Sequence, residues 1–164
     1  MASGVKMNDK CVETFNKLKK NHTLQYCLFK LSGDGFKEVI VEKEKTIDCE
    51  DKKKFFENFV RCIKEDYSEK CLYGAVDFAG RKDKEGKTIE KVIFISWVPN
   101  DAKMKEKMVH AATLNAVTQT LSVSDALQLF DKEELDEMCI CEKMKIALDL
   151  DQCSDEQCIV QQMH

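Results

Sequence analysis

Residues 91–121 read KVIFISWVPNDAKMKEKMVHAATLNAVTQTL, and this stretch predicts a buried strand, a break and a long helix. Residues 92–95 are all apolar and lack the polar alternation of a strand that faces water on one side. Such a run is typical of a strand covered on both faces. Pro99 ends the strand because proline has no N–H to donate to a sheet, and Asn100 or Asp101 is expected to cap the next helix. A sheet covered on both sides is therefore the expected centre of the fold.

The helix predicted over residues 102–121 changes character along its length. Its charged side chains all lie in the first half: Lys103, Lys105, Glu106 and Lys107. From residue 109 to residue 121 there is no charge, and apolar side chains point around most of the circumference. We therefore expect the second half to be largely buried and the first half to reach into solvent, where it could contact a partner.

The flanking sequence supplies further helices and strands in a regular order. Apolar spacing and glycine punctuation predict two helices, at residues 9–21 and 50–64, and two β-hairpins, pairing residues 25–31 with 38–41 and 71–78 with 91–98. A short strand is expected over residues 126–130, and then a last helix that opens at Asp131 with Glu134 in a capping box. The predicted order is α-ββ-α-ββ-α-β-α. This order favours the α/β (α+β) class, with a mixed central β-sheet sandwiched by helices.

Composition and charge are those of a single globular domain with an acidic end. The chain has 164 residues, 43% of them hydrophobic and 34% charged, and only one proline. We expect one domain over residues 1–148 and an acidic, loosely held tail over residues 149–164. Residues 81–107 hold eight basic and five acidic side chains, whereas residues 131–164 hold three basic and ten acidic ones. This separation argues against nucleic-acid binding and favours a basic patch for an acidic protein or an anionic lipid.

The sequence shows no signal for membranes or export. No apolar run approaches the roughly eighteen residues that a membrane-spanning helix needs. The N-terminal residues 1–6 lack the apolar stretch of a secretory signal. A cytoplasmic protein without a membrane span is therefore the expectation.

Nine cysteines do not predict a disulfide scaffold here, since their number is odd and no export signal accompanies them. Four lie among apolar neighbours and are expected to be buried, reduced thiols: Cys11, Cys27, Cys62 and Cys71. The spacing of Cys139 and Cys141, with Cys153 and Cys158 behind them, does not fit a zinc site, whose paired ligands are usually two to four residues apart. No nucleophile, phosphate-loop or zinc-protease motif is present, so we expect no enzyme activity, cofactor or metal. A thiol- or metal-dependent enzyme stays open as the least favoured alternative.

Residues 95–113 resemble the signature of the actin-depolymerising factor/cofilin family. In that signature a strand ends in Trp-x-Pro, and Ala and then Lys-x-Lys-Met lead into a helix of small residues, as they do here. Three further segments agree in order and spacing. They are Met1–Val5, which matches the family's N-terminus, Asn16–Lys19, at the end of its first helix, and Cys71–Asp77, which is similar to its central Tyr-Ala-x-x-Asp strand. The resemblance covers about residues 3–146 and implies the family's fold, a mixed sheet flanked by helices.

The resemblance also implies a function. It describes a monomeric, cytoplasmic actin-binding protein that depolymerises or severs filaments without a cofactor. Five residues fall on positions that bind both monomeric and filamentous actin: Ser3, Gly4, Lys105, Lys107 and Met108. Arg81, Lys82 and Lys84 match a loop that touches filaments in particular.

Regulation is implied at two places. Ser3 is similar to the family's inhibitory phosphorylation site, where a phosphate would add nearly two negative charges facing an acidic partner. Anionic phosphoinositide lipids are expected to compete with actin through Lys103, Lys105 and Lys107.

Several residues depart from the family pattern. Lys103 stands where proline is usual, His110 where tyrosine is frequent, and Leu114 where a lysine or arginine is found. Residues 135–138 are acidic where relatives carry basic filament contacts. Because actin is acidic, we expect monomer binding to be retained more firmly than severing. A relative of the same fold that binds branched-filament machinery instead of actin is the second interpretation.

Overall fold

The computed structural model describes residues 5–32, 35–82, 88–124 and 126–143. Within these ranges six strands form one sheet in the order β1-β3-β2-β4-β5-β6. The strands are β1 (Lys6–Met7), β2 (Leu24–Ser32), β3 (Glu38–Thr46), β4 (Leu72–Lys82), β5 (Thr88–Trp97) and β6 (Ala126–Leu129). The helices are α1 (Asp9–Lys19), α2 (Lys52–Asp66), α3 (Met104–Thr120), the 3-10 turn η1 (Lys132–Glu134) and α4 (Glu137–Lys143).

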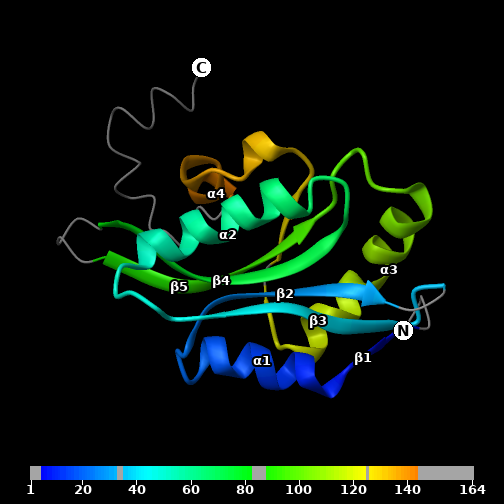
Figure 1. Ribbon diagram of the computed structural model, residues 1–164, viewed down its shortest axis with the longest axis horizontal. Coiled ribbons are helices and arrows are strands. Elements are labelled where there is room, and N and C mark those ends of the chain that lie inside the picture. Colours follow the sequence, from blue (N-terminus) through cyan, green and yellow to red (C-terminus); the bar gives the residue numbers. More distant parts are fainter. Residues whose placement is uncertain (1–4, 33–34, 83–87, 125, 144–164) are drawn as a thin grey trace.

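The sheet is mixed, as the sequence predicts. Strands β2, β3, β4 and β5 pair antiparallel with their neighbours, whereas β1 joins β3 and β6 joins β5 in parallel. Helices α2 and α4 cover one face, and α1 and α3 cover the other (Figure 1). Ile93 and Ile95 of β5 are buried beneath α2, whereas Phe94 between them is buried on the α1 side. The predicted strand with both faces covered is therefore confirmed.

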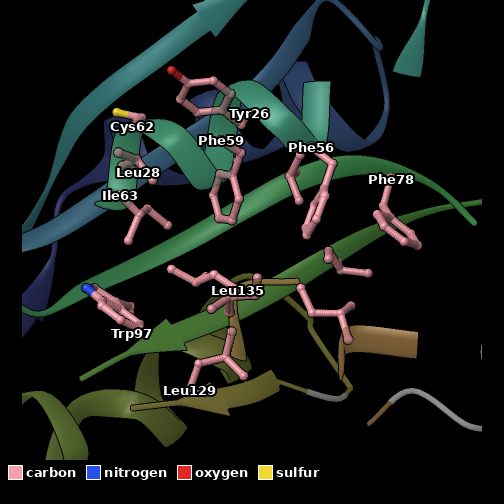
Figure 2. Close-up of a cluster of buried hydrophobic side chains, with 14 of the residues drawn as sticks. Tyr26, Leu28, Phe56, Phe59, Cys62, Ile63, Phe78, Trp97, Leu129 and Leu135 are labelled. Atoms are coloured by element: carbon pink, nitrogen blue, oxygen red, sulfur yellow. The ribbon is translucent and has the colours of Figure 1, made fainter. Parts of the chain in front are cut away.

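Aromatic side chains fill the space between α2 and the sheet (Figure 2). The rings of Tyr26 and Phe59 meet edge to face with their centroids 5.7 Å apart, and those of Phe56 and Phe78 do so at 5.2 Å. Such pairs add to the free energy gained by burying the rings. The indole N–H of Trp97 donates to the Tyr67 carbonyl at 2.9 Å, so the ring is buried with its polar group satisfied.

Gly74 lets Phe59 pack directly on β4. A Cβ atom at this position would lie 2.8 Å from the Phe59 ring carbons Cε1 and Cζ and 3.3 Å from Leu28 Cδ2. The Gly74→Ala variant is therefore expected to lower the free energy of unfolding by about 1–3 kcal/mol, the usual range for overpacking a core. Urea unfolding of both proteins measures this change. A variant as stable as the parent would mean that Phe59 moves aside at no cost.

Two features of the ends of elements differ from expectation. The two-residue strand β1 was not predicted, although the cap of α1 was: the Asn8 side chain accepts from the Lys10 N–H at 2.9 Å. The last helix does not begin at Asp131, the predicted start. The capping box of Asp131 and Glu134 forms but serves only η1, because the backbone turns at Leu135, which is buried under α2, and α4 begins at Glu137.

Cys11, Cys27, Cys62 and Cys71 are buried, as expected. No helix in the described ranges is long and apolar enough to cross a membrane. The predicted tail, residues 149–164, lies outside the described residues.

Candidate functional site

Helix α3 is fixed to the rest of the molecule along one face. Thr113 and Val117 are buried on this face, and His110 and Glu106 lie on it about one and two turns nearer the N-terminus. The Glu106 carboxylate accepts a hydrogen bond from the backbone N–H of Cys71, just before β4. Because this inward face is anchored at several points, the direction of the outward face is also fixed.

His110 is the central anchor of α3. Its ring stacks on Tyr73 with centroids 3.9 Å apart, and its Nε2 lies 2.9 Å from the Ser96 hydroxyl oxygen. Nδ1 is buried and has no hydrogen-bond partner among the described residues. A bare ring acceptor costs less than a bare N–H, so we assign the proton to Nε2, which donates to Ser96. Burial lowers the pKa of His110 to about 3, so this residue is a neutral structural group at physiological pH.

Two methionines dominate the outward face of α3. Met104 and Met108 are 68% and 65% exposed and lie about one turn apart. At about 100° per residue, Lys105 lies some 60° to one side of Met108 and Lys107 about 100° to the other. The helix therefore presents flexible thioethers between two ammonium groups, which suits an apolar groove with an acidic rim.

The start of α3 differs from the sequence-based expectation. Neither Asn100 nor Asp101 caps the helix; the N-cap residue is Lys103, without a side-chain hydrogen bond. Asn100 instead donates to the Asp131 carboxylate at 3.1 Å, and its carbonyl accepts from the Lys107 ammonium at 2.6 Å. These contacts tie the loop before α3 to the chain after β6 and bring exposed Phe130 to the same end of the helix.

The expected burial of the second half of α3 is wrong. Beyond Lys107 only His110, Thr113 and Val117 of the helix are buried, whereas Ala111, Ala112, Asn115 and Gln119 are exposed. Three well-packed inward side chains suffice to attach the helix, and exposed alanines leave little apolar area in water. The charge-free part of α3 therefore extends the surface begun by Met104 and Met108.

The structure brings together some of the predicted site residues. Lys105, Lys107 and Met108 share the first two turns of α3. Arg81 and Lys82 belong to the last residues of β4, at the opposite end of the long axis from the start of α3 (Figure 1). Ser3, Gly4 and Lys84 lie outside the described residues. Sequence reasoning missed Met104, although its i, i+4 spacing from Met108 was a signal for a shared face.

Two observations in the described ranges bear on metal and thiol chemistry. No group of three or more His, Cys, Asp or Glu side chains there is arranged to hold a metal ion. Burial raises the pKa of Cys11 to about 11, and burial together with the nearby Glu106 carboxylate raises that of Cys71 to about 12. These two thiols are therefore protonated and unreactive at neutral pH.

Comparison with known proteins identifies the family of the chain. The sequence profile of the cofilin/tropomyosin-type actin-binding protein family matches residues 4–145. The chain belongs to this family. It is 32% identical to Cofilin-4 of Dictyostelium discoideum over 146 residues, which cover 88% of this chain and 100% of that protein. Membership in the cofilin family agrees with the signature at residues 95–113.

Solved structures of cofilin-family proteins share the fold. The crystal structure of Streptomyces griseoflavus cofilin has a TM-score of 0.69 at 28% identity and covers 85% of this chain and 96% of its own. That of Plasmodium berghei actin depolymerization factor 2 has a TM-score of 0.71 at 26% identity, covering 91% and 99%. The fold class predicted from the sequence is thereby confirmed.

Proposed function

We propose that this cofilin-family protein binds actin monomers and filaments in the cytoplasm and promotes filament depolymerisation and severing. The observation that carries the proposal is the outward face of α3, where Met104 and Met108 are exposed between Lys105 and Lys107. The family's description as actin-binding supplies the partner. No cofactor is required, because the proposed activity depends on binding alone.

The proposed site for both monomeric and filamentous actin comprises Ser3, Gly4, Lys105, Lys107 and Met108. Arg81, Lys82 and Lys84 are proposed as a separate filament contact, which agrees with the distance between the end of β4 and the start of α3 (Figure 1). Asp136 is exposed just before α4 and Glu137 opens it, so this segment offers acidic groups to an acidic filament. We therefore propose that the protein binds monomers tightly and that its filament severing is weak.

The direct test compares binding of the full chain to monomers and filaments. Fluorescence titration of labelled actin monomers and co-sedimentation with filaments should both show binding, with the monomer affinity higher. Binding to neither form would contradict the proposal and would favour the second interpretation, a partner in the branched-filament machinery.

Replacing both exposed methionines should separate binding from stability. The Met104→Ala/Met108→Ala variant is expected to lose about 1 kcal/mol or more of monomer-binding free energy, because these side chains would fill an apolar groove. The free energy of unfolding should change by less than about 0.5 kcal/mol, since both side chains are largely exposed. Titration and urea unfolding of the same preparation test both statements. An unchanged monomer affinity would remove the methionines from the site.

Phosphorylation of Ser3 is proposed to inhibit actin binding. The Ser3→Glu variant adds one negative charge, which costs about 1 kcal/mol, roughly fivefold in affinity, when it lies about 4 Å from a like charge in water. Ser3→Ala serves as the uncharged control in the monomer titration. Equal affinities of the two variants would contradict an electrostatic role for this position.

Competition by anionic lipids is proposed at Lys103, Lys105 and Lys107. Vesicles containing phosphoinositides should bind the protein and displace actin monomers, and the effect should fade as salt is raised. Binding that persists at high salt would contradict this mechanism.

A further inference from the structure

A pocket of about 300 Å3 lies on the face of the sheet that α1 and α3 cover (Figure 1). The end of α1, the start of α2, strands β4 and β5 and the turn after α3 all contribute to its lining. Helix α3 has 17 residues and spans about 25 Å, and Met104 and Lys105 lie at its other end. The pocket is therefore separate from the proposed actin site.

The lining of this pocket is basic. Among the described residues that line it, one is acidic, Asp77, and four are basic: Lys19, His22, Lys52 and Lys91. Even without a charge on His22, three ammonium groups are matched by a single carboxylate, which leaves two positive charges in excess. A concave surface lined by charges of one sign concentrates ions of the opposite sign. The charge balance therefore favours an anion as the occupant.

The Asp77 carboxylate holds two of the basic groups in place. Its side chain is only 3% exposed, and its Oδ2 lies 3.4 Å from the Lys52 ammonium and 3.9 Å from His22 Nδ1. This oxygen is buried and accepts no hydrogen bond from the part of the chain that the structure describes. A buried carboxylate is costly unless cations lie beside it, so Lys52 and His22 are kept at the pocket. Because Oδ2 is inaccessible, Asp77 positions the cations and does not itself contact an occupant.

The remaining donors come from other elements. The Lys19 ammonium lies 5.8 Å from the centroid of the Phe15 ring, which also lines the pocket. Lys91 is exposed on β5. The exposed hydroxyl groups of Ser122 and Ser124, in the turn after α3, can also donate hydrogen bonds. The pocket thus offers ammonium and hydroxyl donors from separate parts of the chain.

We propose that this pocket binds the phosphoryl group of a phosphate monoester. Such a group carries nearly two negative charges at neutral pH, which match the excess of two positive charges in the lining. Its three terminal oxygens accept hydrogen bonds from several directions, whereas a carboxylate has one charge and two oxygens in a single plane. The volume is at the lower end of the range for small-molecule sites, so the part of the ligand that enters is small.

An NMR titration of the full chain with inorganic phosphate tests the site without actin. At constant ionic strength, the amide signals of residues 19–22, 52, 91 and 122–124 should shift and saturate with a single dissociation constant. Sodium chloride at the same ionic strength is the blank. Shifts that fail to saturate, or that spread evenly over the exposed lysines, would overturn the proposal.

The Lys19→Gln/Lys91→Gln variant should raise the dissociation constant for phosphate tenfold or more. Both side chains are exposed, so the urea midpoint of unfolding should not change. The Lys19→Arg/Lys91→Arg variant keeps both charges and should bind within about threefold of the parent. The matched control is Lys10→Gln/Lys20→Gln, which removes the same charge at exposed positions outside the pocket. Equal weakening in the two glutamine variants, or no rescue by arginine, would contradict a phosphoryl site at these lysines.

A soluble phosphate monoester and a phospholipid headgroup both present this group, and two further probes distinguish them. The first probe is glycerol phosphate, and the second is vesicles in which phosphatidic acid replaces part of the neutral lipid. Vesicle binding that falls in Lys19→Gln/Lys91→Gln but not in the control supports a headgroup as the ligand. Glycerol phosphate binding that falls in this variant, while vesicle binding does not, supports a soluble monoester. If neither probe is affected by the variant, the proposal is wrong.

Discussion

Changing Lys105 and Lys107 together to alanine is expected to weaken binding to actin monomers by tenfold or more, about 1.4 kcal/mol. The two ammonium groups flank the exposed Met108 on α3, where they would meet the acidic rim of the partner's groove. Their contributions should differ. Lys105 is exposed and is expected to act by charge alone, whereas Lys107 also donates to the Asn100 carbonyl and so holds the loop that leads into the helix.

The measurement is a titration of labelled actin monomers at two salt concentrations. Raising the salt concentration should reduce the difference in monomer affinity between variant and parent, because salt screens the interactions of exposed charges. The Lys105→Gln/Lys107→Gln variant removes both charges while keeping a side-chain donor at position 107, which separates charge from loop anchoring. The matched control is Lys10→Ala/Lys20→Ala, which makes the same change in net charge at exposed positions at or beside α1. Equal losses in variant and control would mean that net charge, not this site, governs the affinity.

The central sheet could be predicted because its signals are local and strong. Residues 92–95 are apolar without interruption, and that pattern has one common meaning, a strand with both faces covered. The strand β1 could not be predicted in this way. It has two residues, and it exists only because Lys6 and Met7 pair in parallel with Glu38 and Val39, far along the chain.

The errors at α3 have a physical explanation. Absence of charge from residue 109 onward indicated burial, but alanine and amide side chains can face water at little cost, so Ala111, Ala112 and Asn115 do so. Asparagine is a common helix cap, yet the Asn100 side chain donates a hydrogen bond to Asp131 instead. This tertiary contact cannot be predicted from the local sequence. Met104 was overlooked because a methionine in a helical sequence indicates core as readily as surface.

Lowering the pH from 6.5 to 4 is expected to remove about 3 kcal/mol from the free energy of unfolding through His110 alone. In the folded protein burial lowers the pKa of His110 to about 3, while the unfolded chain keeps the ordinary value of 6.5. Between these two values the unfolded state binds a proton that the folded state does not. The free energy of unfolding therefore decreases as the pH is lowered through this window, by about 1.4 kcal/mol per pH unit. The contribution of His110 levels off below pH 3.

Urea unfolding across this pH range must separate His110 from the carboxylates, which also titrate there. The His110→Gln variant provides the comparison, since glutamine can donate to Ser96 but does not titrate. At pH 7.5 the variant should be less stable than the parent, because the stacking on Tyr73 is lost. As the pH falls the parent should lose stability faster, so that the two curves converge and then cross.

The NMR signals of the His110 ring offer a direct readout of its protonation. They should not shift between pH 7 and pH 5, whereas an ordinary histidine titrates fully in that range. Parallel stability curves for parent and variant, together with a ring that titrates near pH 6.5, would mean that the pocket accepts a proton. In that case α3 would have to move away from Tyr73 and Ser96, and the orientation of Lys105 and Met108 on its other face would depend on pH. The absence of titration would instead mean that His110 does not alter the orientation of α3 between pH 7 and pH 5.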